Sequence, residues 1–269
     1  MTYGEALKFC REAFEKNGIE NSGNESRWLL ESIDDGFMLK LRDEMDSEDM
    51  DEYFSLAQRR VNGEPLQYLI GYWEFYGFDY FVGEGVLIPR SETEMLVDYA
   101  LDVLKDIPDP VVIDLCAGSG CIGLTVAQKL PKAKVYLAEK YDDAYFYLEK
   151  NARNIKNAVL IKGDIFDDLD LPRADLILSN PPYINSDEIS SLQKEVQFEP
   201  ATALDGGEDG LMFYRRIAQI AKENGCPCLA VECGENQSEE IERIFSFFNK
   251  TESLEDFNQI KRIVTAGNR

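Results

Sequence analysis

The chain has 269 residues, enough for one large α/β domain or for a large domain joined to a small one. Its 51 acidic residues outnumber its 28 basic ones, and the formal charge of −23 argues against direct binding of DNA or RNA through phosphate contacts. The sequence has no bilayer-length apolar run, no secretory signal and no histidine, so we expect a cytoplasmic protein without a membrane partner, whose chemistry uses carboxylates, carbonyls, amides or tyrosines.

Residues 1–70 are predicted to form a small helical domain. Apolar side chains recur there at helical spacing in two runs: Leu7, Cys10 and Phe14, then Trp28, Leu29 and Ile33. Asn24 and Ser26 are typical of a helix start, and we expect the acidic stretch 42–52 to be a solvated face or a loop. No residue of this region has a pattern that indicates catalysis.

A change of pattern follows, and we assign residues 71–89 to a β-hairpin that links two domains. Aromatic residues separated by glycines run from Gly71 to Ile88, which is typical of short strands and a turn. Pro89 ends this extended segment, and helical spacing resumes over residues 92–105.

The remaining domain, residues 90–269, is predicted to be a parallel sheet with helices on both faces. Short apolar runs predict buried strands at Val111–Leu115, Lys134–Ala138, Val159–Ile161, Asp175–Ser179 and Cys228–Glu232. Helices are expected between them near residues 121–130, 142–153, 209–224 and 238–248. The last segments, Glu252–Phe257 and Lys261–Ala266, are predicted to form a pair of antiparallel strands. The alternation of strands and helices together with this pair predicts a Rossmann-like α/β fold.

A glycine-rich loop follows the first of these strands. Gly118, Gly120 and Gly123 have the spacing G-x-G-x-x-G, in which glycines let the backbone turn tightly and approach a ligand closely. Glu139 ends the second strand, where it can accept hydrogen bonds from ribose hydroxyls, and Asp164 after the third strand can help to read an adenine. The simpler interpretation is a turn that packs a strand on a helix, and enzymes that use NAD share the pattern. Together the features predict an adenosine-containing cofactor whose identity stays open.

A more specific motif follows the fourth predicted strand: Asn180, Pro181, Pro182 and Tyr183. Ligands of open α/β sheets bind at that edge. A planar NH2 group donates two hydrogen bonds in its plane, and the side-chain oxygen of Asn180 with the backbone oxygen of Pro181 can accept both. Pro181 restricts the backbone of Asn180, and Tyr183 can lie against a flat amide or base. The alternative, a proline-rich loop that merely ends a strand, leaves the motif unexplained.

Three of the six cysteines, Cys226, Cys228 and Cys233, are close together in sequence. No second cluster and no histidine accompany them, so we expect no metal site. Cysteines in apolar stretches usually behave as small buried hydrophobic residues.

With its glycine loop and its Asn-Pro-Pro-Tyr motif, the sequence resembles the Rossmann-like amino-methyltransferases, and in particular the peptide chain release factor glutamine N5-methyltransferases of the HemK type. The resemblance covers about residues 60 to 269 and is carried by further stretches at 63–71, 86–94, 199–211, 232–237 and 261–264. It implies that S-adenosyl-L-methionine is the methyl donor, that S-adenosyl-L-homocysteine is the product, and that no metal takes part. It also implies that the partner is a bacterial release factor, methylated on the glutamine of its Gly-Gly-Gln motif, and that residues 1–70 recognise this substrate.

The same resemblance implies roles for individual residues. The cofactor would be bound by Cys116, Ala117, Gly118, Ser119, Gly120, Glu139, Asp164, Ile165 and Asn180. The glutamine would be held by Asn180, Pro181, Pro182 and Tyr183, of which Asn180, Pro181 and Tyr183 are the expected catalytic residues. The chain departs from the family pattern at Cys116-Ala117, where a glycine is usual, and at Glu139, where an aspartate is usual.

Other functions stay open at this point. The same clamp would serve a ribosomal-protein glutamine N5-methyltransferase or a nucleic-acid methyltransferase that acts on adenine or guanine amino groups, although the charge disfavours the latter. A catalytically silent adenosine-binding module is an alternative of another class, which an intact Asn180–Tyr183 motif disfavours. The sequence does not determine the oligomeric state, the interdomain angle or which release factors are accepted.

Overall fold

The computed structural model describes residues 1–268; Arg269, the last residue of the predicted domain 90–269, lies outside the described residues. The chain divides into two compact units. The N-terminal unit comprises Met1–Tyr72 and Gln193–Phe198, and the C-terminal unit comprises Trp73–Leu192 and the chain from Glu199 onward. Within the described residues, no helix combines the length and the apolar character that crossing a bilayer requires.

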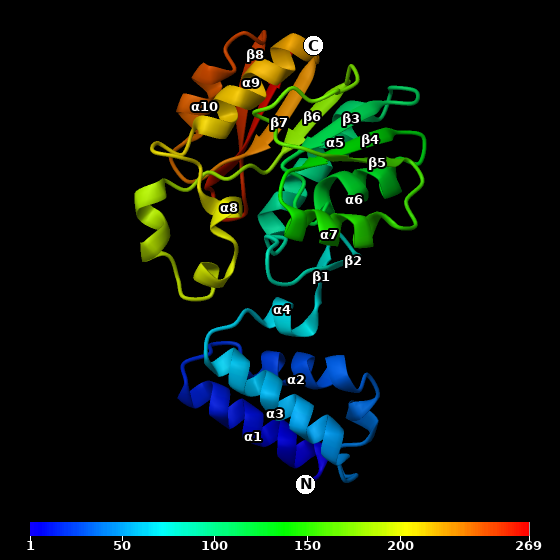
Figure 1. Ribbon diagram of the computed structural model, residues 1–269, viewed down its shortest axis with the longest axis vertical. Helices are drawn as coiled ribbons and strands as arrows, with labels where there is room; N and C mark the ends of the chain where they lie inside the picture. The colour runs from blue at the N-terminus through cyan, green and yellow to red at the C-terminus, as the bar shows by residue number, and fades with distance from the viewer. Residues whose placement is uncertain (269) are drawn as a thin grey trace. The chain divides into compact units, whose positions relative to one another are not determined.

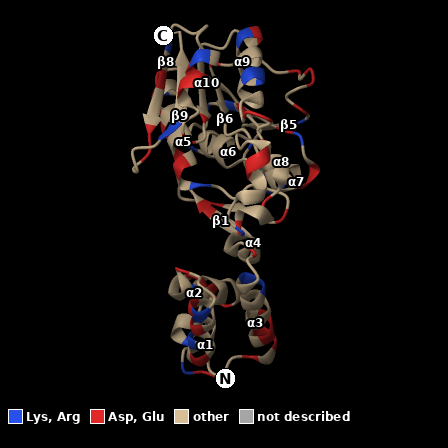
Figure 2. Cartoon of the chain, turned by 90° about the vertical axis from the view of Figure 1, so that its left-hand side faces the viewer, with Lys and Arg blue, Asp and Glu red and all other residues tan. Residues whose placement is uncertain are grey.

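The N-terminal unit consists of helices, as predicted, whose bounds are α1 Tyr3–Lys16, α2 Ser22–Ile33, η1 Phe37–Leu39, α3 Ser47–Val61 and α4 Leu66–Ile70. Thr2 caps α1 because its hydroxyl accepts from the Glu5 backbone while Glu5 accepts from the Thr2 backbone. The α3 helix carries acidic residues in its first turn and basic ones in its last, which complements the helix dipole (Figure 2).

The predicted helix start at Asn24 and Ser26 is wrong, because α2 begins at Ser22 and both residues lie inside it. Ser26 is fully buried, and its carbonyl accepts a 2.9 Å hydrogen bond from the Tyr53 hydroxyl. A side chain that is favourable at a helix start is therefore used here at a packed position between helices.

A hairpin of β1 Tyr72–Phe75 and β2 Phe78–Phe81 follows, and its residues from Trp73 onward belong to the C-terminal unit. Its two-residue turn places Tyr76 and Gly77 at φ of 56° and 79°, the left-handed conformation that such tight turns require. Tyr80 is buried and its hydroxyl lies 2.7 Å from the Thr125 hydroxyl, which joins the hairpin to the next part of the fold.

The main sheet has seven strands in the described residues, in the order β5-β4-β3-β6-β7-β9-β8. The strands are β3 Val111–Leu115, β4 Lys134–Glu139, β5 Ala158–Lys162, β6 Leu176–Ser179, β7 Cys228–Glu232, β8 Lys250–Glu255 and β9 Lys261–Gly267. The first five are parallel, whereas β9 is antiparallel to β7 and β8. The predicted Rossmann-like fold with a terminal antiparallel pair is thereby confirmed.

Helices cover both faces of this sheet (Figure 1). One core contains buried side chains of α5 Glu94–Leu104, α6 Cys121–Lys129 and α7 Asp142–Ala152, and the other contains those of α9 Met212–Asn224 and α10 Ser238–Ile244. Short elements complete the unit: η2 Ser91–Thr93, η3 Ser186–Ser191 and α8 Ala201–Leu204, while η4 Val196–Phe198 lies in the N-terminal unit. Both cores are continuous and apolar, so the sheet is a rigid base for the loops at its edge.

The order of the strands decides where a ligand can bind. From β3 the chain builds β4 and β5 on one side and then crosses to β6 on the other, so β3 and β6 flank the topological switch point. Leu115 lies opposite Ser179, and the buried Ser179 hydroxyl donates to the Leu115 carbonyl at 2.6 Å. The loops that begin at Cys116 and Asn180 therefore leave the sheet side by side.

The close approach of α6 to β3 predicts a cost for a larger residue at Gly123. A Cβ atom there would lie 2.7 Å from Leu137 Cδ2 and 2.8 Å from Asp114 Oδ2. We expect Gly123→Ala to lower the free energy of unfolding by ~1–3 kcal/mol in urea titrations, because overpacking forces neighbours to shift. The control is Gly267→Ala at the end of β9, where a Cβ would meet atoms no closer than 3.8 Å, and it should be close to neutral. Equal losses in the two variants would contradict this interpretation.

Candidate functional site

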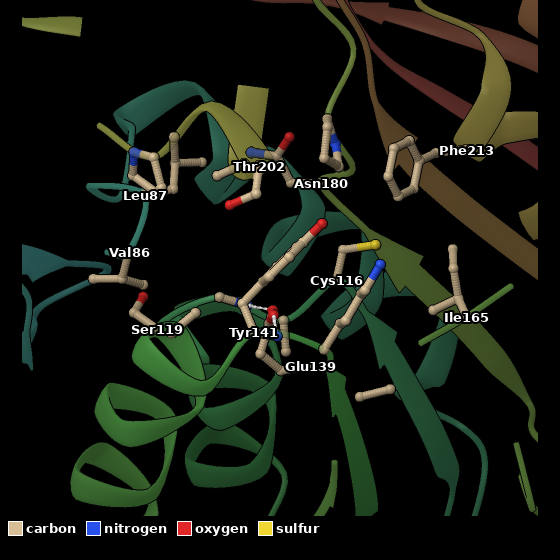
Figure 3. A pocket seen from close by; sticks show the side chains of 18 of the residues that line it. Val86, Leu87, Cys116, Ser119, Glu139, Tyr141, Ile165, Asn180, Thr202 and Phe213 are labelled. Carbon is tan, nitrogen blue, oxygen red and sulfur yellow. Dashed lines mark hydrogen bonds between the residues drawn. The ribbon is translucent and has the colours of Figure 1, made fainter. Parts of the chain in front are cut away.

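A cavity of about 430 Å³ opens at the carboxyl edge of β3, β4 and β6, within the C-terminal unit. Its size is typical of sites for small molecules. Figure 3 shows Val86 and Leu87 on one side of it and Ile165 and Phe213 on the other. Asn180 and Glu139 lie at opposite ends of this view, so the cavity joins the glycine loop to the Asn-Pro-Pro-Tyr motif.

The loop after β3 is shaped by left-handed backbone conformations. Gly118 and Gly120 have φ of 55° and 83°, and Cys116 has φ of 58°, a region that disfavours side chains other than glycine. Cys116 thus occupies a position whose backbone suits glycine, and its thiol faces the cavity (Figure 3). Burial raises the pKa of this thiol well above its usual value, so it stays neutral.

Gly118 has a second reason to lack a side chain. A Cβ atom built there would find no neighbour closer than Val86 Cγ2 at 3.9 Å, and because Gly118 lines the cavity, the added atom would take up ligand space. Gly120, by contrast, does not line the cavity; it precedes α6, where a Cβ would overlap Leu148 at 2.5 Å. The first glycine leaves room for a ligand, and the second lets the loop pack on α7.

Glu139 ends β4 and is 6% exposed. One carboxylate oxygen accepts from the backbone N–H of Gly118 at 2.9 Å, and the other accepts from the backbone N–H of Tyr141 at 2.8 Å. A carboxylate has about four lone-pair sites, so Glu139 can still accept hydrogen bonds from a diol such as a ribose. The two backbone donors fix its orientation before any ligand arrives.

Beyond Glu139, the cavity combines a paired acid with an apolar wall. Asp164 lies 2.8 Å from the Lys140 ammonium and accepts from the Phe166 backbone at 3.0 Å. Although partial burial opposes it, these contacts lower the pKa of Asp164, which stays ionised. Ile165 is 4% exposed and lies across the cavity from Val86, as Phe213 does (Figure 3). An apolar slot beside hydrogen-bond acceptors suits a flat, polar-edged base such as adenine.

The Asn-Pro-Pro-Tyr motif follows β6 directly, and only part of it faces the cavity. Asn180 and Pro182 line the cavity, whereas Pro181 and Tyr183 do not, and the Tyr183 hydroxyl lies 3.5 Å from Glu232 Oε1. Gln237 holds the loop in place because its side-chain amide donates to the Tyr183 carbonyl at 2.8 Å. The expected contact of the Tyr183 ring with a substrate amide stays a prediction.

Thr93, which the resemblance places in a segment expected to close over the site, lines the cavity, whereas sequence reasoning overlooked four further residues of its wall: Tyr141, Thr202, Met212 and Phe213. Tyr141 follows the strand-ending Glu139 by two positions, a local signal that could have identified it. Met212 and Phe213 begin α9, and nothing in their own spacing distinguishes them from core residues of an amphipathic helix. Their place in the cavity depends on how the long loop before α9 returns to the sheet.

That returning loop is tied down by an ion pair at the cavity rim. Glu199 is 5% exposed, pairs with the Arg90 guanidinium and accepts from the Ile88 backbone at 3.0 Å. Pro200 and Thr202, which follow Glu199, are thereby held against the segment that contains Val86. The rim is assembled from two stretches that are far apart in sequence.

The three clustered cysteines belong to the apolar interior. All three are buried; the Cys226 thiol donates to the Cys228 carbonyl at 3.0 Å, and the Cys233 thiol lies 3.7 Å from the Lys261 carbonyl. Within residues 1–268, no group of three His, Cys, Asp or Glu side chains is arranged to hold a metal ion.

Two family descriptions match the chain. The PrmC N-terminal domain matches residues 5–71, and the methyltransferase small domain matches residues 93–208. Among curated relatives, the release factor glutamine methyltransferase of Geobacter sulfurreducens is 38% identical over 98% of this chain and 95% of its own length. The protein of the same name from Thermodesulfovibrio yellowstonii is 40% identical over 82% of each chain.

Solved structures share the fold at much lower identity. The human Mettl16 catalytic domain in complex with the MAT2A 3′UTR hairpin 6 aligns with a TM-score of 0.59 and 15% identity over 83% of each chain. The Thermus thermophilus 16S rRNA N2 G1207 methyltransferase, in complex with AdoMet and guanosine, aligns with a TM-score of 0.51 and 16% identity over 74% of this chain and 50% of its own. These similarities show a common fold and leave the substrate to be argued from the site.

The geometry at Gly118 predicts a loss of ligand affinity on substitution. We expect Gly118→Ala to weaken the binding of S-adenosyl-L-homocysteine, measured by titration calorimetry, by roughly 10-fold or more, because the added methyl group takes up cavity space. The matched control is Gly77→Ala: Gly77 also has a positive φ, of 79°, but does not line the cavity. Both variants should lose similar stability from backbone strain, and only the first should lose affinity. Equal affinities would show that Gly118 does not face the ligand.

Proposed function

This chain belongs to the family of release factor glutamine methyltransferases, and on that basis we propose that it methylates the side-chain amide nitrogen (N5) of the glutamine in the Gly-Gly-Gln motif of bacterial peptide chain release factors. The observation that carries the proposal is that Asn180 and the glycine loop line one cavity. A methyl donor held by the loop and an amide held by Asn180 would then meet within reach of each other.

The donor in this proposal is S-adenosyl-L-methionine, which supplies a methyl group activated by a sulfonium and leaves as S-adenosyl-L-homocysteine. Glu139, already oriented by two backbone N–H groups, accepts from the ribose hydroxyls. Ile165 and Phe213 would cover the adenine, and the backbone from Cys116 to Ser119, which lines the cavity, would lie along the remainder of the donor. The proposed reaction requires no metal ion.

The clamp has to overcome the weak nucleophilicity of an amide. The nitrogen lone pair is delocalised into the carbonyl group, so an amide rarely attacks an electrophile. Asn180 Oδ1 and the Pro181 carbonyl oxygen accept hydrogen bonds from the two N–H groups of the substrate amide. These hydrogen bonds point the nitrogen at the methyl group. Such positioning lowers the activation free energy by up to roughly 7–11 kcal/mol in well-oriented reactions.

The same two acceptors act on the charge that develops during transfer. As the nitrogen gains positive charge, its N–H bonds become better donors, and the fixed carbonyl dipoles stabilise the transition state more than the ground state. No strong base is required, because the proton becomes acidic once the nitrogen carries the methyl group. It can then leave to water.

Replacing Asn180 should separate turnover from donor binding. We expect Asn180→Ala to lower kcat by roughly 100-fold or more, since one transition-state acceptor is lost, and to change the Kd for S-adenosyl-L-homocysteine by less than about 3-fold. Asn185→Ala is the control, because Asn185 lies in the same loop, bonds to Glu188 at 3.2 Å and does not line the cavity. Loss of donor affinity in step with kcat would contradict this division of roles.

The substrate is tested by methyl transfer from radiolabelled S-adenosyl-L-methionine to a purified bacterial release factor. A release factor whose Gly-Gly-Gln glutamine is replaced serves as the matched control. Label on the normal factor alone supports the proposal for reaction, substrate and acceptor together. Label on neither factor, with label on a ribosomal protein, would move the assignment to ribosomal-protein glutamine methylation.

A further inference from the structure

The hydrogen bonds behind Asn180 form a chain that ends on a buried carboxyl group. Asn180 Nδ2 donates to Thr93 Oγ1 at 3.3 Å, and the Thr93 hydroxyl donates to Glu232 Oε2 at 2.5 Å. Thr93 is 2% exposed and Glu232 is 3% exposed, so water cannot readily substitute for either partner. Tyr183 places its hydroxyl 3.5 Å from the other carboxyl oxygen, so Glu232 lies behind both polar side chains of the motif.

The fold puts these three side chains together through strand register. Ser179 of β6 pairs with Val231 of β7, so the next residues, Asn180 and Glu232, lie at neighbouring strand ends. Thr93 ends η2, directly before α5, a helix that packs against β6 and β7. Three elements that are distant in sequence therefore supply one hydrogen-bonded chain.

The chain has a direction that the chemistry of its members dictates. A hydroxyl group has one proton and two lone pairs, whereas an ionised carboxylate only accepts. Thr93 must therefore give its proton to ionised Glu232 and can only accept from Asn180. Asn180 must in turn direct its NH2 group to Thr93, which leaves its oxygen for the cavity.

We propose that Glu232 and Thr93 are positioning residues that fix the orientation of the Asn180 amide, so that Oδ1 and not Nδ2 faces the substrate nitrogen. This inference rests on the proposed function and deepens it. With the amide reversed, an NH2 group would face the substrate NH2 group, and two donors cannot form a hydrogen bond. A neutral side chain at position 232 can donate as well as accept, so it no longer dictates the direction of the chain.

The charge of Glu232 changes near neutral pH. Burial raises its pKa to about 7, against the opposing effects of the hydrogen bonds with Thr93 and, more weakly, with Asn180. The charged and titratable groups that face it come from each neighbouring element: Glu92 of η2, Arg262 of β9, Tyr183 after β6, Tyr214 of α9, Cys121 of α6 and Cys233 after β7. Glu92 disfavours ionisation of Glu232, and Arg262 favours it while also pairing with Asp256 at 3.1 Å. Burial raises the pKa values of the two tyrosines and the two cysteines.

The kinetic test compares the full chain with Thr93→Val, Thr93→Ser and Glu232→Gln, using release factor and S-adenosyl-L-methionine between about pH 6 and 9. We expect wild-type kcat to fall on the acidic side with a midpoint near the Glu232 pKa of about 7. Thr93→Val and Glu232→Gln should lower kcat at alkaline pH by roughly 10-fold or more, and Glu232→Gln should also remove this fall in kcat at acidic pH. Thr93→Ser, which keeps the hydroxyl, should have the kcat and the pH profile of the wild type, and donor affinity should be similar in all four proteins.

Three results would overturn the proposal. The first is a Thr93→Val enzyme as fast as wild type, and the second is a Thr93→Ser enzyme as slow as Thr93→Val, which would mean that the methyl group rather than the hydroxyl matters. The third is a fall in kcat at acidic pH that persists in Glu232→Gln. Burial also raises the pKa of Asp114 to about 7. Because every variant retains Asp114, a fall in kcat at acidic pH that Asp114 caused would persist in Glu232→Gln.

A second readout does not depend on turnover. In protein labelled with ¹⁵N-asparagine, the Nδ2 resonances of Asn180, assigned by their absence in Asn180→Ala, should shift with a midpoint at the Glu232 pKa of about 7. The shift should be absent in Glu232→Gln and present in Thr93→Ser. Wild-type resonances that do not move with pH would overturn the inference. If neither the wild type nor any variant transferred a methyl group, the proposed function would be contradicted. The pH dependence of the Asn180 resonances would still test the positioning role of Glu232 and Thr93.

Discussion

The parallel pairing of β3 with β6 and of β6 with β7 is the constraint on which the site depends. Because Leu115 is opposite Ser179 and Ser179 is opposite Val231, three neighbouring strands end at the same level of the sheet. The residues that follow, Cys116, Asn180 and Glu232, carry the glycine loop, the amide clamp and the carboxyl group behind the clamp. A shift in either pairing would separate them, since each residue advances a strand by about 3.3 Å.

Most polar groups of the cavity are held before a ligand binds. Glu139 is fixed by two backbone N–H groups, Asp164 by Lys140, and Asn180 by Thr93. Catalysis by fixed dipoles requires such preorganisation, because reorienting polar groups during the reaction would cost free energy. The left-handed Cys116 is a local strain of the kind often found at functional sites, and here the surrounding loop and strands maintain it.

The fold could be predicted from the sequence because the patterns that indicate its strands and helices are local. Short apolar runs gave the strands of the sheet, and the glycine spacing together with Asn180–Tyr183 identified the two loops that line the cavity. The start of α2 was misjudged because Asn24 and Ser26 are chemically suited to a helix end, whereas packing against Tyr53 places Ser26 inside. Phe213 gave no such signal, and Glu232 gave only a family resemblance without a role. An apolar residue at a helix start and an acid at the end of a buried strand acquire their roles only through tertiary contacts. The Arg90–Glu199 ion pair, which joins residues more than a hundred positions apart, was hidden for the same reason.

The measurement that tests the central claim most directly is a crystal structure of this protein with S-adenosyl-L-homocysteine and a peptide that contains Gly-Gly-Gln. We expect the glutamine amide nitrogen to lie in the cavity within about 2.9 Å of both Asn180 Oδ1 and the Pro181 carbonyl oxygen. Asn180 Nδ2 should at the same time remain on Thr93. A glutamine bound elsewhere, or an Asn180 amide that turns its nitrogen to the substrate, would contradict the proposed clamp.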